Sequence, residues 1–359
     1  MSMPSTRKRV FALMVKESRQ LGRDRATLGM LLGIPLLQIA LFGGAIELAP
    51  HRLDIRIIAS DTGAYTRIER VIAATGASVR LSRSSSGAAA QAALARGQAL
   101  VVIDVDARPS VVYVDATNPV LATQAELTIE RALASISGPV DDDAPAFSVR
   151  RLYNPGLTTP PFMVTGLIGV ILTMSVVMMS ALSVARERER GTLEGLLAAQ
   201  VTPGELWLGK FAPYVFLGLV QAAFVLAVAR FLFHIVPIGS VRLLGVSTLM
   251  FAIANVALGI LFSCIARVQM QAMQMTFFFF LPSSLLSGFM FPFAAMPRWA
   301  QLLAETLPLT HYLRIVRGLV LRGVDTPFVL AELVPIVVFA VCASIAALLV
   351  ARREIYSQR

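Results

Sequence analysis

Few side chains in this sequence are placed to carry out chemistry. Glu332 stands near the start of the last long apolar run, and Cys264 and Cys342 lie inside apolar runs, which predicts core packing rather than a disulfide or zinc site. The histidines are few and widely separated: His51, His234 and His311. An enzyme or a proton-coupled carrier would need clustered acids and histidines. The sequence therefore argues against both classes and predicts no catalytic residue and no metal site.

A nucleotide-binding loop is not predicted either. Gly209-Lys210 is followed by Phe211 and lacks the upstream glycine of the GxxxxGK[ST] pattern. We therefore expect no cofactor on this chain. The run Asp141-Asp142-Asp143 follows Gly138-Pro139 and is interpreted as a solvated turn in preference to a calcium site.

The composition indicates a membrane protein. Of 359 residues, 56% are hydrophobic and only 15% are charged, which is too apolar for a chain with a mostly polar surface. A membrane span needs about 20 apolar residues to cross roughly 30 Å of hydrocarbon. Six segments qualify, at 26–46, after Pro160-Pro161 within 152–185, and at 211–229, 243–266, 268–297 and 328–351.

Basic residues predict the orientation of these spans. If the N terminus is cytoplasmic, all three lysines and most arginines near span ends fall on the inner side. The short outer segments then carry only Arg230, Arg242, Arg298, Arg314, Arg317 and Arg322. Both termini are therefore expected in the cytoplasm, and the apolar run at 26–46 is longer than the core of a signal peptide, which predicts an uncleaved anchor. The formal charge of +10 indicates anionic lipid head groups rather than nucleic acid, because the long soluble insert is neutral.

That insert, residues 48–158, is predicted to be an extracytoplasmic α/β domain. Segments rich in Val, Ile, Leu and Phe predict strands at 53–59, 79–82, 99–105, 111–116 and 147–152. Helical spacing of Ala, Glu and Arg predicts helices at 66–75, 87–96 and 119–137. The expected fold class is thus an α-helical membrane protein with six transmembrane helices and an α/β domain between helices 1 and 2.

The remaining boundaries follow from these assignments. Residues 1–25 are expected to form a cytoplasmic amphipathic interface helix and 26–47 the first transmembrane helix. Residues 159–353 hold transmembrane helices 2–6, with a cytoplasmic loop at 186–210 and an outer re-entrant segment at 282–322. Residues 354–359 form a cytoplasmic tail.

A charged loop follows the second span. Residues 186–190 read Arg-Glu-Arg-Glu-Arg, and Arg190 and Glu194 stand four apart, so their charges can pair on a helix surface. Gly191 is expected to end that helix before a short amphipathic one, and residues 202–205 form a capping box that starts the next helix. A solvated turn is the simpler interpretation of such a charge run. However, the leucines of the short helix need a partner to cover them: Leu193, Leu196 and Leu197.

At this loop the sequence resembles the ABC-2 type permeases of ATP-binding cassette exporters, in particular the bacterial branch with a large extracytoplasmic domain between the first two spans. The similar residues are Arg186–Glu194, Thr202-Pro203, Gly209-Lys210, Tyr153-Asn154-Pro155, Leu281–Pro292, Met296-Pro297, Pro308–Tyr312 and Arg317-Gly318. The resemblance covers residues 152–353, and the N-terminal anchor by position.

The resemblance implies that the loop after the second span is a coupling helix that docks on a separate ATP-binding cassette ATPase subunit, which binds the ATP and Mg. It assigns to this interface Glu187, Glu189, Gly191, Thr192, Glu194 and Leu197. It also implies that the N-terminal amphipathic segment lies along the inner membrane surface. The alternating apolar and basic residues of 8–25 favour the same arrangement, with a plain positive-inside flank as the alternative.

The fifth span contains residues that are expected to break its helix. A backbone that is not helical at membrane depth must be buried in protein or line a cavity. The candidates for the substrate path are therefore the residues of this broken region: Phe277, Phe280, Pro282, Gly288 and Pro292. Two short segments follow, at 299–307 and 309–321, which the resemblance interprets as a re-entrant hairpin on the outer side. One face of the second carries a cationic stripe of His311, Arg314 and Arg317, which could guide an anionic head group. The alternative is that these side chains extend to the membrane interface by snorkelling.

Taken together, the sequence predicts a multi-pass permease of the bacterial inner membrane that exports an amphipathic drug or lipid-like molecule. Half of a pore per chain predicts a dimer, expected to be a homodimer, with a heterodimer as the alternative. A periplasmic adaptor is a further partner that the outer domain could touch, and no nucleic acid is expected. A receptor with an outer ligand-binding domain is the competing interpretation, although the cytoplasmic segments are too short for an output domain.

Overall fold

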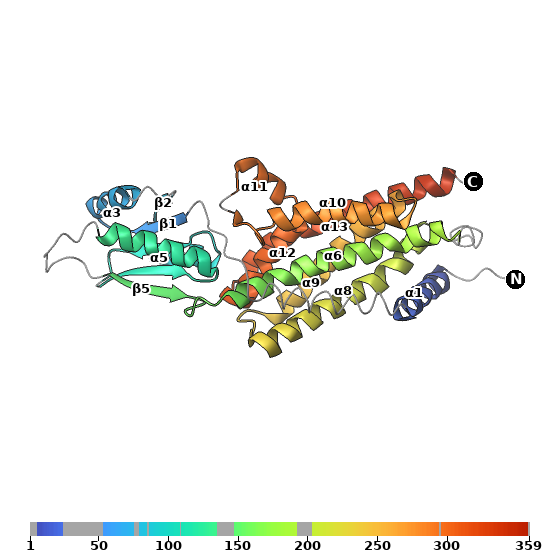
Figure 1. Cartoon of the computed structure of the whole chain (residues 1–359), viewed down its shortest axis with the longest axis horizontal. Coiled ribbons are helices and arrows are strands. Elements are labelled where there is room, and N and C mark those ends of the chain that lie inside the picture. The colour runs from blue at the N-terminus through green and yellow to red at the C-terminus, as the bar shows by residue number, and fades with distance from the viewer. Residues whose placement is uncertain are drawn as a thin grey trace.

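The computed structural model describes residues 6–23, 53–74, 79–84, 86–107, 109–134, 147–191, 203–293 and 296–357. These parts form an elongated molecule with a mixed α/β unit at one end and a bundle of long helices over the rest of its length (Figure 1). The predicted first span at 26–47 and the predicted turn at Asp141–Asp143 lie outside the described residues.

The α/β unit contains a five-stranded sheet. Its strands are β1 (Leu53–Ile58), β2 (Val79–Ser84), β3 (Val101–Asp104), β4 (Ser110–Asp115) and β5 (Phe147–Leu152), in the spatial order β2-β1-β3-β4-β5. Only the β3–β4 pair is antiparallel. The helices are α3 (Thr62–Ala74), α4 (Gly87–Ala95) and α5 (Pro119–Ala134). The predicted strands and helices of this region are confirmed, with ends shifted by a few residues.

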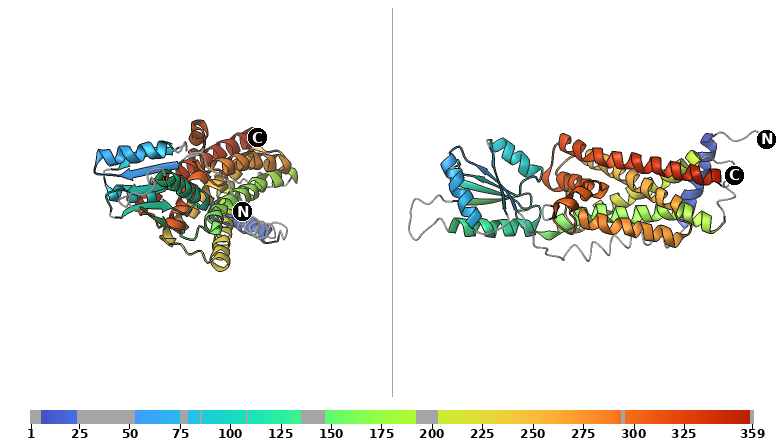
Figure 2. Two further views of the ribbon diagram at one scale, coloured as in Figure 1. Left: turned by 60° about the vertical axis from the view of Figure 1, so that its left-hand side comes forward. Right: turned by 90° about the horizontal axis from the view of Figure 1, so that it is seen from above.

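The two faces of the sheet are buried by different helices. Side chains alternate along a strand, so Ile55 and Ile57 face one side, where they pack with residues of α3 and α5 such as Ile129. Ile58 and Val102 face the other side, where they pack with Leu94 of α4. This three-layer arrangement gives the unit a core of its own (Figure 2).

Five long helices form the bundle. They are α6 (Thr159–Glu189), α8 (Pro203–Phe233), α9 (Val241–Ile265), α10 (Gln269–Leu286) and α13 (Thr326–Ser357). Four helices in the described ranges are long and apolar enough to cross a membrane, through Thr159–Glu189, Leu208–Phe233, Val241–Ile265 and Thr326–Arg353. They coincide with the second, third, fourth and sixth predicted spans.

The fifth predicted span, 268–297, does not form one continuous helix, as its proline and glycine residues predicted. Helix α10 has 18 residues and ends at Leu286. The expectation that Pro282 contributes to this break is wrong, because α10 continues through it. In apolar surroundings a helix interrupted by proline still satisfies more backbone groups than an open chain does. The break comes at Gly288, whose positive φ of 80° turns the chain.

Two short helices and one π-helical turn follow the break. They are α11 (Arg298–Ala304), α12 (Pro308–Arg317) and η2 (Gly318–Arg322), which confirms the two short segments predicted there. They lie at the end of the bundle beside the α/β unit, which we call the sheet end (Figure 1). Arg322 in η2 contacts Asp115 of β4, with an Nη2–Oδ2 distance of 2.7 Å.

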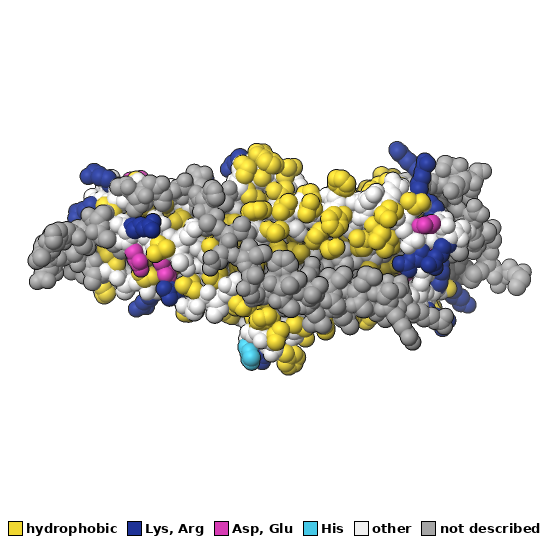
Figure 3. All heavy atoms as spheres, viewed as in Figure 1, with side chains coloured by type: hydrophobic (Ala, Val, Ile, Leu, Met, Phe, Trp, Pro, Cys, Tyr) yellow, Lys and Arg dark blue, Asp and Glu magenta, His cyan; other side chains and the backbone are white. Residues whose placement is uncertain are grey.

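Helix α1 (Thr6–Arg23) lies at the opposite end, which we call the α1 end, near the C-terminal end of α13 (Figures 1 and 2). The helices α6 and α9 have the largest buried faces, while α13 exposes Val334, Val338 and Val341. Hydrophobic side chains cover much of the visible bundle surface, and Lys and Arg side chains gather at the α1 end (Figure 3). This distribution is typical of a protein whose helices cross a bilayer.

Candidate functional site

The α1 end contains a close contact between α1 and α8. A Cβ atom on Gly209 of α8 would lie 2.6 Å from Cβ of Leu13, so only glycine permits α1 to approach this closely. Lys210 is the next residue and points into the same junction, where it is buried. The Gly209-Lys210 pair therefore holds α1 against α8.

Five residues form an ion cluster at this junction, which we call the α1-end cluster: Lys16, Glu17, Glu187, Lys210 and Tyr214. The Lys210 ammonium lies 3.3 Å from Oε2 of Glu17 and 3.1 Å from Oε2 of Glu187, and donates to the Ser183 carbonyl. Lys16 donates to Oε1 of Glu187. The Tyr214 hydroxyl donates to Oε1 of Glu17 at 2.7 Å. Three helices, α1, α6 and α8, are thus joined by the buried charges of Glu17, Glu187 and Lys210, with Lys16 at the exposed edge of the cluster.

This cluster lies at both ends of the predicted coupling segment. Glu187, at the start of the segment 186–210, belongs to the last turn of α6, and Lys210, at its end, belongs to the first turns of α8. Of the residues assigned to the ATPase interface, Glu187 is buried within the cluster, and Glu189 accepts hydrogen bonds from Gln269. Gly191 has a positive φ of 68°, and the helix ends before it as predicted. Thr192, Glu194 and Leu197 lie outside the described residues.

A cavity of about 960 Å³ opens beside the cluster, between α1 and the end of α6. Lys16 and Arg19 of α1 face it, together with Arg186 and Arg190. Among the described residues, the charged side chains that line it are cationic.

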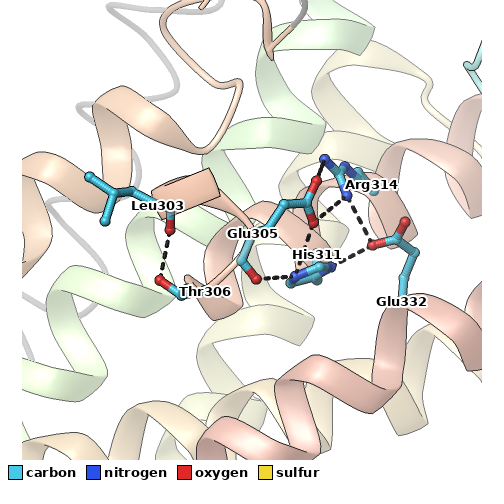
Figure 4. A network of polar contacts seen from close by, with 6 residues as sticks. All are labelled: Leu303, Glu305, Thr306, His311, Arg314 and Glu332. Atoms are coloured by element: carbon cyan, nitrogen blue, oxygen red, sulfur yellow. Dashed lines mark hydrogen bonds and ion pairs between the residues drawn. The ribbon is translucent and has the colours of Figure 1, made fainter. Parts of the chain in front are cut away.

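The sheet end holds a second ion cluster, the sheet-end cluster of Glu305, His311, Arg314 and Glu332 (Figure 4). Nδ1 of His311 lies 2.6 Å from Oε2 of Glu332, and its Nε2 lies 2.9 Å from the Glu305 carbonyl oxygen. Arg314 donates to both carboxylates, at 2.6 Å to Oε1 of Glu305 and 3.4 Å to Oε2 of Glu332. The cluster fixes the α11–α12 junction and α12 itself to α13.

The surroundings of His311 favour its charged form. Both ring nitrogens face oxygen acceptors, and only the imidazolium can donate from both. Burial by itself lowers the pKa of His311, but hydrogen bonds to Glu332 and the Glu305 carbonyl, with the Glu332 charge, raise that pKa above its ordinary value. With His311 protonated, two cations balance two carboxylates.

The predicted cationic stripe has two different parts. His311 and Arg314 are neutralised by Glu332 and Glu305, so they do not present free positive charge. Arg317 instead donates to the Gly288 carbonyl at 2.9 Å and lies 3.9 Å from the Phe162 ring centroid. Burial, followed by the charge of Arg322, lowers the pKa of Arg317 to about 9. Arg317 thereby holds the chain where α10 breaks.

The substrate-path candidates divide into two groups. Phe277 and Phe280 belong to α10, and Phe277 is exposed on the bundle surface. Gly288 and Pro292 line a small cavity of about 30 Å³ that also reaches Phe162. The structure therefore brings Gly288, Pro292 and Arg317 together at the sheet end, while Phe277 faces outward.

Comparison with known proteins decides the family. The ABC-2 family transporter protein family matches residues 25–349. The chain belongs to the ABC-2 transporter family. It is 28% identical over 364 residues to the "Probable multidrug ABC transporter permease YbhR" of Escherichia coli K12, covering 97% of this chain and 99% of that relative. It is 30% identical to the "Probable multidrug ABC transporter permease YbhS" of the same organism, over 90% of this chain and 91% of that relative.

A shorter match supports the same family. The "Inner membrane transport permease YhhJ" of Escherichia coli K12 is 30% identical over 188 residues, or 51% of this chain and 50% of that relative. The chain is thus an ABC-2 type permease and a membrane protein, as the resemblance at the loop predicted.

Sequence reasoning missed both ion clusters of this ABC-2 permease. The expectation that His311 and Glu332 stand apart is wrong, because α12 packs against α13 and joins them. A signal for the α1-end cluster was present, since Leu13 and Glu17 stand four apart and share one face of the helix. An acid on the buried face of a basic helix requires a cation. Within the described ranges, no group of three or more His, Cys, Asp or Glu side chains is placed to hold a metal ion.

Proposed function

We infer that this protein is the membrane-spanning permease subunit of an exporter, driven by a separate ATPase subunit that docks on the 186–197 loop. The observation that carries this inference is the α1-end cluster. Glu187 and Lys210, which stand at the two ends of the 186–210 segment, form an ion pair with each other, and each also pairs with a residue of α1. A push on the loop would therefore move the ends of α6, α8 and α1 as one body.

The arrangement of the ends supports an orientation. Helix α1 and the end of α13 lie together, opposite the α/β unit, and basic residues gather there (Figures 1 and 3). The positive-inside rule then puts both termini in the cytoplasm and the α/β unit outside. With the first predicted span, and with α10 as the fifth, the proposal has six transmembrane helices and the α/β domain between helices 1 and 2.

The assembly and the cargo extend the same proposal. Two copies, most simply a homodimer, would enclose a path that an amphipathic drug or lipid-like molecule follows outward. The names of YbhR and YbhS as multidrug permeases support this substrate class. A periplasmic adaptor would contact the α/β domain.

The test is vanadate-sensitive ATP hydrolysis in proteoliposomes that contain the chain and its ATPase. Glu194→Lys in the loop reverses a charge at the proposed interface, and Gly191→Pro changes the turn that has positive φ. Both variants are expected to reduce copurification of the ATPase and to lose stimulation of hydrolysis.

The matched control is Arg150→Glu, a charge reversal on the exposed surface of β5. It should leave hydrolysis unchanged. If no ATPase copurifies, or the loop variants behave like the control, the coupling assignment is wrong. Ligand binding by the α/β unit alone would then favour a receptor.

A further inference from the structure

The end of α6 contacts the turn that joins α9 to α10. Nη1 of Arg188 donates to the carbonyl of Ala266, the residue that follows α9, at 2.6 Å, and Nη2 donates to the Cys264 carbonyl at 3.3 Å. The last carbonyl groups of a helix have no partner within it, and a cation is favourable at this end. Arg188 therefore completes the end of α9 from a neighbouring helix.

Glu189, the next residue, does the same for the start of α10. Its Oε2 accepts hydrogen bonds from the backbone N–H and from the side-chain amide of Gln269, both at 3.0 Å. Val268, the residue before α10, provides no side-chain cap for this helix, and a negative charge is favourable at a helix N terminus. Two consecutive residues of α6 thus hold both sides of the α9–α10 turn.

The turn is also packed closely on α6. Oγ of Ser263 accepts hydrogen bonds from two backbone N–H groups of α6, those of Val184 and Ala185, at 2.8 and 3.0 Å. Four alanines from α6, the turn and α10 form a small buried cluster beside it: Ala181, Ala185, Ala266 and Ala272. Small side chains allow helices to approach closely inside a membrane. The end of α6, the turn and the start of α10 are therefore packed as one unit.

The other end of α10 is held to α6 as well. The chain turns at Gly288, just after α10 ends, and the Gly288 carbonyl accepts a hydrogen bond from Arg317. The guanidinium of Arg317 lies over the ring of Phe162, near the start of α6. Between these ends α10 packs chiefly against α6. A displacement of α6 is therefore passed to α10 at both ends.

We propose that Arg188 is a positioning residue for transport: it holds the α9–α10 turn to α6, so that movement of the 186–197 loop displaces α10 and, at its far end, Gly288 and Pro292. This role rests on the proposed function, because a docked ATPase must move the loop. It adds α10, the helix that leads to the substrate-path candidates, to the helices that the loop displaces. Glu189, which the resemblance assigns to the ATPase interface, contributes to the same contact within the permease.

The experiment follows α10 in proteoliposomes that contain the full chain and its ATPase. Met270→Cys introduces an exposed thiol in the first turn of α10, in a Cys342→Ser background that leaves only the buried Cys264. The rate of maleimide labelling is measured before and after vanadate traps the ATPase. With Arg188 in place, trapping is expected to change this rate by about fivefold. Arg188→Met should abolish most of the change in complexes that retain the ATPase.

Three further variants in the same labelled background separate the contact from charge and from folding. Arg188→Lys keeps a donor for one carbonyl group and should restore part of the change. Gln269→Ala lies outside the loop and removes one of the two hydrogen bonds to Glu189, so it should reduce the change to about half while the ATPase still copurifies. The matched control is Arg267→Met, which removes an exposed cation of the same turn and should leave the change intact. Arg188→Lys and Gln269→Ala keep the test decisive if Arg188→Met does not fold.

The outcomes distinguish this inference from the proposed function. If no ATPase binds to the chain with Arg188 in place, the proposed function is wrong and this inference is overturned with it. If the ATPase binds and hydrolyses ATP but trapping leaves the labelling rate at position 270 unchanged, only this inference is wrong. An undiminished change in Arg188→Met, even with a lower unfolding midpoint, would reduce the contacts to caps that stabilise the turn. Loss of the ATPase from Arg188→Met but not from Arg267→Met would place Arg188 in the ATPase interface instead.

Discussion

The two ends of the bundle each carry an ion cluster, and the clusters differ in their exposure to solvent. At the α1 end, the side chains of Lys210, Glu17 and Glu187 are 3%, 4% and 5% exposed. At the sheet end, His311 is 5% exposed, but Glu332, Arg314 and Glu305 are 17%, 29% and 43% exposed. Ion pairs near solvent contribute little, whereas removal of one partner from a buried cluster leaves an uncompensated charge. The α1-end cluster should therefore contribute more to the free energy of unfolding than the sheet-end cluster does.

The largest expected effect is at the α1 end. Lys210→Met removes the ammonium that lies between two buried carboxylates, and should reduce the free energy of unfolding by about 3–5 kcal/mol. Chemical and thermal unfolding of the purified protein in detergent would measure it. Adding Glu187→Gln to Lys210→Met removes one of the buried carboxylate charges that no longer has its lysine partner, and should restore part of the stability. A double variant less stable than Lys210→Met would contradict this explanation.

A smaller effect is expected at the sheet end. Glu332→Gln removes the carboxylate that His311 and Arg314 share, but Glu305 still pairs with Arg314. The expected loss is about 1–2 kcal/mol in the same measurement. A loss as large as that of Lys210→Met would mean that the two clusters do not differ as their exposure suggests.

The sheet-end cluster should also respond to pH. Since the pKa of His311 is raised above its ordinary value of 6.5, its contribution to stability is complete below that value and is lost as the pH rises through the folded-state pKa. The groups that face His311 are Glu332, Arg314 and Glu305. The unfolding midpoint of wild type should therefore decrease over this range more than that of His311→Gln. Parallel curves for the two proteins would refute the assignment.

The smallest effect is expected for Lys16→Met. The Lys16 side chain is 42% exposed, so its ion pair with Glu187 is screened by solvent and should contribute less than about 1 kcal/mol. Unfolding of this variant beside Lys210→Met compares two lysines that contact the same carboxylate. Equal destabilisation would show that burial does not decide the strength of these contacts.

Much of the fold could be predicted from local patterns. The strands and helices of the α/β unit follow from side-chain periodicity, and four spans follow from apolar length. The end of α6 before Gly191 follows from the residue type, because glycine adopts a positive φ readily. The place of the break in the fifth span could not be predicted in this way, since whether a helix continues through Pro282 depends on the surroundings of its backbone.

The candidate site was predictable only in part. The sequence located the loop that belongs to the ABC-2 family and the cationic residues of α12. It could not show that Arg314 is neutralised while Arg317 contacts a carbonyl group, because the difference lies in which segments pack on each side of one helix.

The sequence by itself determined the membrane class, the family and the positions of most helices, because apolar length, charge and periodicity are properties of neighbouring residues. Only the tertiary structure decided which charges meet. Glu17 and Lys210 are 193 positions apart, and they form a buried pair because Gly209 lets α1 approach α8. His311 and Glu332 meet because α12 packs on α13. Such pairs depend on the distance between helices and on the exclusion of water, and a pattern of neighbouring residues predicts neither.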